Sequence, residues 1–373
     1  MSSTSLLLAS TIVTRKTKEI DDEVSLYSMR MHIKNRDYEW QIVWRNVLAF
    51  VYLHAASLYA VYLVLSGRCM LKTVVFALLF DLFAALGVTA GAHRLWAHRA
   101  YKARWPLRLF LAIMQTMAFQ NHIYEWVRDH RVHHKFTETD ADPHNAKRGF
   151  FFSHIGWLMV RKHKDVFEKG ITVDMSDLEK DPIVMFQKKT YLVVMPLICF
   201  IIPTWIPVYY WGENPWTSWY VAAMFRYTLA LHCTWLVNSA AHIWGNKPFD
   251  KNIGATDNVK VAIFAFGEGW HNYHHVFPWD YKAAELGDYS TNFSTALIDL
   301  AAKIGLAYDL KTVSLDMIKK RVARTGDGSH PLSKDLSAPL EDHHHPDNPV
   351  WGWDDADMPE EDKKLAEIYK KLE

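Results

Sequence analysis

Four long apolar runs, arranged as two close pairs, constrain the fold of this 373-residue chain more than any other feature. The first pair is 47–65 and 73–92, and the second is 191–211 and 216–241. Each run is close to the ~20 residues that a helix needs to cross a ~30 Å hydrocarbon core. The links within the pairs are short, so each pair is expected to form an antiparallel hairpin. The predicted fold class is an all-α membrane protein with four transmembrane helices in two hairpins, capped by a cytosolic helical domain; a buried soluble bundle is the alternative.

Positive charge is distributed unevenly around these runs. Seven Lys or Arg residues precede the first run, and five follow the second at positions 94–108. The links within the pairs contain only Arg68 and Lys72. The positive-inside rule therefore places both termini and the central region in the cytosol. The apolar stretches 109–119 and 150–160 are too short to span and predict in-plane helices or a lid on the membrane face.

The runs divide the chain into six expected parts. They are a cytosolic N-terminal tail (1–41), the first hairpin (42–92), a cytosolic segment (93–189), the second hairpin (190–241), another cytosolic segment (242–325) and a disordered C-terminal tail (326–373). The last tail is predicted from its Gly, Ser, Pro, Asp and His content, and its triple histidine at 343–345 is interpreted as solvated. No cleavable signal peptide is expected, because the positive charges near the N-terminus follow the apolar stretch instead of preceding it.

Composition excludes several classes of function. The net charge is +1, and no block rich in Lys and Arg favours nucleic-acid binding. The three cysteines, Cys69, Cys199 and Cys233, lie in or beside apolar runs, and none forms a CxxC pair. A disulfide framework and a cysteine zinc site are therefore not expected.

Nine histidines fall in four clusters, three of which adjoin the end of an apolar run or the central cytosolic segment. The clusters contain His93 and His98; His130, His133 and His134; His242; and His271, His274 and His275. Residues spaced i, i+3 and i+4 share one face of a helix, which suits the second cluster as part of a metal shell. His93 and His98 are five apart, or ~140° on a regular helix, so they share a metal only if the helix ends or bends there.

Nine imidazoles exceed the four to six ligands of one metal ion, so two ions are expected. An all-imidazole shell excludes Ca²⁺ and Mg²⁺, which prefer oxygen, and fits iron, zinc or copper. Two redox metals at a membrane surface point to O₂ activation on a lipid. Six of the histidines outside the clusters are expected to be hydrogen-bonded structural residues. They are His54, His122, His144, His154, His163 and His232.

Four motifs carry a specific resemblance: HRLWAH at 93–98, DHRVHH at 129–134, NSAAH at 238–242 and GWHNYHH at 269–275. Over about 44–329 the sequence resembles the membrane acyl-CoA desaturases of the stearoyl-CoA (delta-9) type, especially those of insects. The resemblance implies that one iron is held by His93, His98, His130, His134 and His274. It implies that the other is held by His133, His242, His271 and His275, with Asn238 reaching it through water. It also places the CoA end against Asn121, Arg128, Asp129, Arg161 and Lys162, and Trp235 beside the acyl chain.

The resemblance implies a function. A cis double bond, with delta-9 as first choice, would enter saturated C16–C18 acyl-CoA, using O₂ and two electrons from cytochrome b5 and its NADH-dependent reductase. No His-Pro-Gly-Gly haem motif is present, so the donor is expected to be a separate protein. Two Fe²⁺ ions are the expected cofactors, with zinc as a substitute in overexpressed protein. The expected location is the endoplasmic reticulum membrane, since the last four residues, Lys-Lys-Leu-Glu, resemble a dilysine retention signal.

Three alternatives remain beside this interpretation: a delta-11 or other regiospecific desaturase, a histidine-box lipid hydroxylase and, outside enzymes, a metal transporter. Asp81 lies within the second apolar run, where a carboxylate is costly and marks a functional site by default. By the resemblance, it falls near the closed end of the acyl tunnel. We expect it to influence chain-length or double-bond preference, with Arg226 as a candidate partner. A structural pair or a neutral acid is the alternative.

Overall fold

The computed structural model describes residues 40–334 and 349–370. The chain divides into two units, 1–41 and 42–373, and the elements described here belong to the second. Three sequence predictions lie outside the described residues: nearly all of the N-terminal tail, the triple histidine at 343–345, and the dilysine signal beyond its first lysine.

Within residues 40–334 and 349–370, three continuous helices are long and apolar enough to cross a membrane. They are α2 (Trp44–Leu65), α3 (Leu71–Leu86) with the π-helix η1 (Gly87–Ala97), and α9 (Pro182–Pro196) with η4 (Leu197–Ile201) and α10 (Ile202–Trp211). They contain 22, 27 and 30 residues respectively. Many of their apolar side chains are exposed, as with Leu58 and Leu192 at 73% and 84%. Exposed apolar helices of this length indicate a membrane protein.

The fourth apolar run forms a continuous helix that is not among these three. It consists of α11 (Pro215–Ser218), η5 (Trp219–Phe225) and α12 (Arg226–Asn238), followed by the short α13 (Ala240–Ile243). It packs against α2 and α3. Arg226, buried at its centre, donates to the carbonyl oxygens of Cys199 (2.7 Å) and Met117 (3.3 Å). This arginine makes the helix less apolar than its neighbours, and the four-span topology stays a prediction.

Two helix boundaries differ from those predicted. The second helix continues beyond residue 92 to Ala97 and so includes part of the first histidine cluster. The third begins at Pro182 instead of about 190, because Asp181 caps it by accepting from the Ile183 N–H (3.0 Å) and proline suits the first helical position. Charged and polar residues precede the apolar part of this helix and concealed its start.

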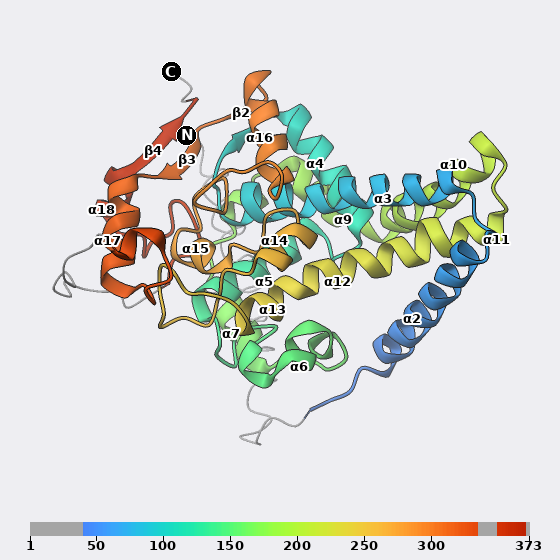
Figure 1. Ribbon diagram of the computed structural model, residues 1–373, viewed down its shortest axis with the longest axis horizontal. Coiled ribbons are helices and arrows are strands. Elements are labelled where there is room, and N and C mark those ends of the chain that lie inside the picture. The colour runs from blue at the N-terminus through green and yellow to red at the C-terminus, as the bar shows by residue number, and fades with distance from the viewer. Residues whose placement is uncertain (1–39, 335–348, 371–373) are drawn as a thin grey trace, which may run out of the picture. The chain divides into compact units, whose positions relative to one another are not determined.

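Shorter elements gather at the left ends of the long helices in Figure 1. The α-helices are α4 (Trp105–Ala118), α5 (Ile123–Phe136), α6 (Phe150–His154), α7 (Lys164–Gly170), α8 (Ser176–Glu179), α14 (Val259–Phe264), α15 (His271–Val276), α16 (Phe293–Lys303), α17 (Leu315–Thr325) and α18 (Glu360–Leu365). The 3₁₀ turns are η2 (Ala146–Arg148), η3 (Gly156–Leu158) and η6 (Pro331–Lys334). Strand β1 (Lys102–Ala103) pairs antiparallel with β2 (Ala307–Tyr308), and β3 (Leu310–Val313) with β4 (Ala366–Tyr369).

The main apolar core joins η1, α4 and α5, and it holds the first two histidine clusters together. Its buried side chains include Trp96, Leu111 and Val127. At Gly87, a Cβ would lie 2.2 Å from the Gln115 nitrogen of α4, so the two helices approach this closely only because the residue is glycine.

The C-terminal region differs from the predicted disordered tail. Residues 349–370 contain α18 and β4, and Trp351 and Met358 are buried. The composition of the whole tail is polar, but Val350 and Met358 belong to one apolar cluster with Phe249 and Tyr273. Composition averaged over 48 residues (326–373) concealed these few apolar side chains.

Candidate metal centre

A change of helix type brings His93 and His98 together. The His98 N–H donates to the His93 carbonyl oxygen (3.1 Å), which is an i→i+5 bond, and the two ring centroids lie 4.7 Å apart. An α-helix would separate these residues by ~140°. The π-helix η1 therefore supplies the bend that the spacing required, and π-turns of this kind are frequent at functional sites.

Nine imidazoles converge in two groups. Within each group, one nitrogen atom of each ring lies within 4.8 Å of those of the other members. The first group contains His93, His98, His130, His134 and His274, and the second contains His133, His242, His271 and His275. These groups have the same members as the two ligand sets implied by the resemblance. Helix α5 contributes to both groups, since His133 belongs to the second group while His130 and His134 belong to the first.

The protonation pattern of the rings fits a metal cation. His133 Nδ1 donates to Asp142 Oδ1 (2.9 Å), His98 Nδ1 donates to the Trp351 carbonyl oxygen, and His93 Nδ1 lies 2.8 Å from Glu268 Oε2. A neutral ring with its proton on Nδ1 has a lone pair on Nε2.

These Nε2 atoms nevertheless point at one another. His98 and His130 approach to 2.9 Å, and His93 and His274 to 3.0 Å, through Nε2. Facing lone pairs repel unless a cation lies among them. The donor set is therefore one for a transition metal and not for Ca²⁺ or Mg²⁺.

Burial keeps these rings available as ligands. Removal from water, reinforced by neighbouring imidazoles, holds the pKa of seven of them well below the ordinary histidine value. They are His98, His130, His134, His242, His271, His274 and His275. The rings are consequently neutral at neutral pH, which is the form that binds a metal.

Two buried carboxylates orient the ligands. Glu268 Oε1 accepts from Arg94 Nη2 (2.7 Å), and its other oxygen contacts His93. Burial alone would raise the pKa of Asp142, but His133 and His144 hold it below the usual aspartate value. Such partners fix the ring orientation and tautomer of metal-bound histidines. Sequence analysis did not find either acid, because no spacing pattern distinguishes them from other acidic residues.

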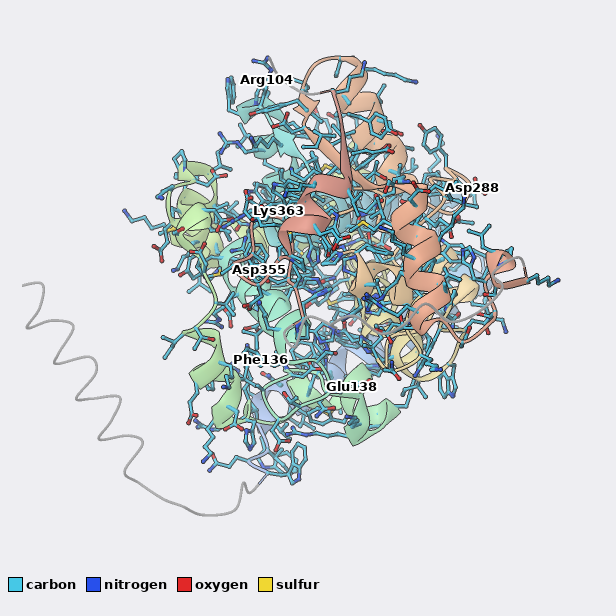
Figure 2. All side chains as sticks on the ribbon, turned by 90° about the vertical axis from the view of Figure 1, so that its left-hand side faces the viewer. Arg104, Phe136, Glu138, Asp288, Asp355 and Lys363 are labelled. Atoms are coloured by element: carbon cyan, nitrogen blue, oxygen red, sulfur yellow. The ribbon has the colours of Figure 1, made fainter. Side chains whose placement is uncertain are left out.

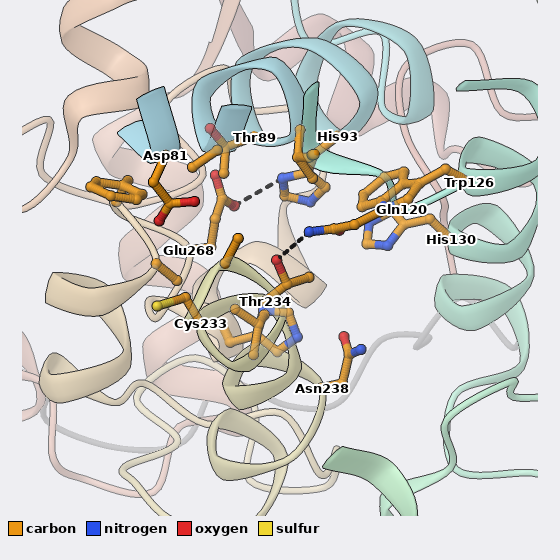
Figure 3. A pocket seen from close by; sticks show the side chains of 18 of the residues that line it. Asp81, Thr89, His93, Gln120, Trp126, His130, Cys233, Thr234, Asn238 and Glu268 are labelled. Atoms are coloured by element: carbon orange, nitrogen blue, oxygen red, sulfur yellow. Dashed lines mark hydrogen bonds and ion pairs between the residues drawn. The ribbon is translucent and has the colours of Figure 1, made fainter. Parts of the chain in front are cut away.

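Two cavities adjoin the histidine groups. The outer one has a volume of about 1700 Å³ and the inner one about 730 Å³, both including space that is open to solvent. Both are lined by Gln120, Trp126, His130, Thr234 and Asn238. Gln120 Nε2 donates to Thr234 Oγ1 (2.9 Å), and Figure 3 shows this bond crossing the inner cavity below His93. The inner cavity thus lies directly beside rings of both histidine groups and has mainly apolar walls.

Comparison with known proteins agrees with this geometry. Residues 71–282 match the family model described as fatty acid desaturase. The chain is 61% identical to the Acyl-CoA Delta-9 desaturase of Acheta domesticus, over 90% of this chain and 88% of that protein. It is 60% identical to the Acyl-CoA Delta12-desaturase of the same species, over 89% and 88%. It is 55% identical to Stearoyl-CoA desaturase 5 of Bos taurus, over 79% and 87%.

The chain belongs to the fatty acid desaturase family. It is therefore an oxidoreductase, and its histidine groups are able to hold metal. The relatives of this desaturase are named for delta-9, delta-11 and delta-12 activities, so family membership alone does not define the position of the double bond.

The expected substrate residues lie around the outer cavity of the desaturase. Asn121, Asp129 and Trp235 line it. Arg128 Nη2 pairs with Asp129 Oδ1 (3.0 Å), and the Lys162 ammonium contacts the other oxygen of the same carboxylate. Arg161 precedes Lys162 in the chain. Glu125 lies 3.7 Å from Arg128 and 3.6 Å from Lys162 as well, so two cations and two carboxylates form a charged rim beside the cavity.

Asp81 lines the inner cavity of the desaturase, as Figure 3 shows. Its side chain is 6% exposed, and its Oδ1 has no hydrogen-bond partner in the described part of the chain. Arg226, the candidate partner, uses its guanidinium to bind backbone carbonyls. The predicted Asp81–Arg226 pair is therefore not formed as a direct ion pair.

Of the six other histidines that were expected to be structural, five form hydrogen bonds through their rings, and His144 Nδ1 has no such partner in the described part of the chain. His232 joins His54 (3.1 Å) and His154 (2.9 Å) through its two ring nitrogens. The rings of His122 and His163 cap α5 and α7. His144 lies nearer the metal centre than sequence analysis indicated: its ring centroid is 4.4 Å from that of His133, and its Nδ1 is 3.5 Å from Asp142.

Proposed function

We propose that this desaturase introduces a cis double bond, most simply at delta-9, into saturated C16–C18 acyl-CoA. The proposal rests on one observation above all: a mainly apolar cavity passes beside two groups of converging imidazoles. Such a cavity accepts an acyl chain and excludes water. The imidazole groups would hold the metal that is required to remove hydrogen from unactivated methylenes. The delta-9 relative from Acheta domesticus supports the regiochemistry.

The overall reaction balances as –CH₂–CH₂– + O₂ + 2 e⁻ + 2 H⁺ → –CH=CH– + 2 H₂O. Two iron ions would occupy the groups around His98 and His133, with Asn238 beside the second through water. When bound, they would reduce O₂ with electrons from outside the chain and remove hydrogen from the acyl chain. We propose cytochrome b5, reduced by its NADH-dependent reductase, as the electron donor.

The side chains of the desaturase hold and orient the substrate. In this proposal, Arg128, Arg161 and Lys162 bind the phosphates of CoA at the rim, with Asn121 and Asp129 beside them. Arginine suits this role because its planar fork of donors matches phosphate oxygens. Inside, Trp235 and the Gln120–Thr234 bond shape the path of the acyl chain, so that one C–C bond lies beside the rings.

The proposed setting is the endoplasmic reticulum membrane with both termini in the cytosol. Four spans in two hairpins then correspond to α2, α3 with η1, α9 with α10, and the helix that ends in α12. Helices α5, α13 and α15, which carry seven of the nine histidines, lie near one end of these helices (Figure 1). The division of the chain into two tails, two hairpins and two cytosolic segments also belongs to this proposal. The exception is residues 349–370, which are folded instead of disordered.

Competing functions differ in their products. A delta-11 or delta-12 desaturase would share every proposed metal ligand, and the chain has relatives named for each of these activities. A lipid hydroxylase would use the same shell and insert oxygen. A metal transporter would need a polar path through the spans, whereas the described cavities have mainly apolar walls.

Expression in yeast that lacks its own desaturase tests the proposal. We expect growth without added unsaturated fatty acid, and delta-9 products when double-bond positions are read by mass spectrometry. His271→Gln is the matched inactive control, and His330→Gln, at a ring that pairs with Glu285 instead (2.8 Å), should leave growth intact. If the products carry double bonds at another position only, that position replaces delta-9 in the proposal. Hydroxylated lipid, or no altered lipid from a metal-loaded protein, would overturn the proposal.

A further inference from the structure

The C-terminal segment 349–370 grips one proposed metal ligand from two sides. His98 Nδ1 donates to the Trp351 carbonyl oxygen, and the Trp353 N–H donates to the His98 carbonyl oxygen (2.9 Å). Gly352 lies between these two contacts. A Cβ there would lie 2.5 Å from the His98 carbonyl oxygen, so only glycine permits this approach.

Two arginines contact the Trp351 ring. The Arg131 and Arg99 guanidinium carbons lie 4.1 Å and 4.7 Å from the centre of the ring. Arg131 is fully buried and also donates to the Trp96 (2.6 Å) and Ala97 (3.1 Å) carbonyl oxygens. Because it follows His130 in α5, Arg131 couples this helix to the end of η1 and to the C-terminal segment.

A buried ion pair adds a second attachment to α5. Asp355 Oδ2 lies 2.7 Å from the Lys135 ammonium and accepts from the Trp351 N–H (2.9 Å). Lys135 directly follows His134 and also contacts Asp357. Figure 2 shows Asp355 and Lys363 on the face of the molecule that also carries Phe136, the last residue of α5.

The far end of the segment is anchored to the body of the protein. Strand β4 pairs along its whole length with β3. Val350 and Met358 pack in the apolar cluster that includes Tyr273, which lies between His271 and His274 in the chain. The segment therefore has its own packing energy and does not depend on the contact with His98.

We propose that residues 349–370 form a clamp that positions His98 and thereby completes the five-histidine metal site. The Trp351 carbonyl oxygen fixes the proton of His98 on Nδ1 and leaves Nε2 free to bind metal. Partners of this kind change metal affinity by about 10–100-fold when they are lost. This inference rests on the metal centre of the proposed function, and it assigns a role to a segment outside the four histidine motifs.

The test is the metal affinity of the purified full-length chain, measured by Fe²⁺ titration under anaerobic conditions. Gly352→Ala displaces the clamp from His98 without altering any ligand. We expect one of the two ions to bind about 10–100-fold more weakly and the other to bind as before. Gly287→Ala is the matched control, because its Cβ would meet the flexible Lys282 side chain at 3.3 Å.

Asp355→Asn provides an independent variant, since it removes the ion pair to Lys135 while keeping a side-chain acceptor. It should weaken the same ion, and excess Fe²⁺ should restore turnover in both variants. Two ions bound with unchanged affinity in both variants, at unchanged thermal stability, would overturn the clamp. Loss of both ions together with the fold would also contradict it, because the clamp would then be a general structural element.

The two proposals fail separately. If the wild-type chain makes no unsaturated acyl-CoA but Gly352→Ala still weakens one ion, the clamp stands and the function falls. If the wild-type chain desaturates and Gly352→Ala binds both ions normally, the function stands and the clamp falls.

Discussion

The ring of His98 donates its Nδ1–H to the carbonyl oxygen of Trp351, which lies 253 residues further along the chain. The bond joins the end of the helix η1 to the C-terminal segment. It also determines which nitrogen of His98 faces the other imidazoles. One ligand of the candidate metal centre is thus oriented from outside the histidine motifs.

Glu268→Gln should weaken metal binding by about 10–100-fold, because the charge beside His93 is lost. The same change leaves the buried Arg94 without a counter-charge, so the thermal midpoint should fall as well. Metal titration and thermal unfolding measure the two effects. Glu285→Gln, which removes the partner of His330, is the control for a general loss of charge. Unchanged metal affinity in Glu268→Gln would show that Glu268 does not orient the ligand.

Asp81→Leu should shift the chain-length or double-bond profile of the products, because the changed side chain lines the inner cavity. It should also stabilise the protein by about 1–3 kcal/mol, since a buried oxygen without a partner is removed. Mass spectrometry of products from acyl-CoA of graded length reads the first effect. A product profile identical to that of the wild type would end the hypothesis that Asp81 affects specificity.

Thr234→Val should reduce kcat/KM by about tenfold, which corresponds to about 1.4 kcal/mol. The change keeps the shape of the side chain but removes the acceptor of the Gln120 amide where the two cavities meet. Thr234→Ser keeps the acceptor and is the matched control. Equal kcat/KM in both variants would show that the bond does not contribute to catalysis.

Lys311 makes stability depend on alkaline pH. Burial lowers the pKa of this side chain from 10.5 to about 8. The folded state therefore releases the proton first, and stability rises with pH between about 8 and 10.5 by up to about 3 kcal/mol. This gain is fully present above the unfolded pKa and is lost as the pH falls through about 8. Thermal midpoints of Lys311→Met should lack this rise, and an identical pH dependence in both proteins would contradict it.

The sequence predicts which residues form the candidate site more fully than it predicts the backbone turns and partner residues that position them. Spacings such as His130–His133–His134 are visible in one dimension, so the sequence alone predicts all nine rings as candidate ligands. The sequence shows that the helix must end or bend if His93 and His98 are to share a metal, but it does not predict the π-turn that joins them. Backbone hydrogen bonding of this type leaves no clear pattern in the side chains. Trp351 was missed because its partner lies 253 residues away.

Fold predictions depended on the range of the forces involved. Apolar length identified the three helices able to span a membrane, since burial in lipid depends on composition alone. The fourth run contains Arg226, whose burial is compensated by carbonyl groups from other helices, and composition cannot anticipate such partners. The folded C-terminal segment depends in the same way on packing against distant residues.

The metal content of the purified protein tests the central claim most directly. Elemental analysis of active enzyme should give two iron ions per chain. His274→Ala and His271→Ala, one from each group, should each lose about one ion while the other group keeps its own. Efficient desaturation by a chain that binds one ion or none would contradict the account, as would loss of the same single ion in both variants.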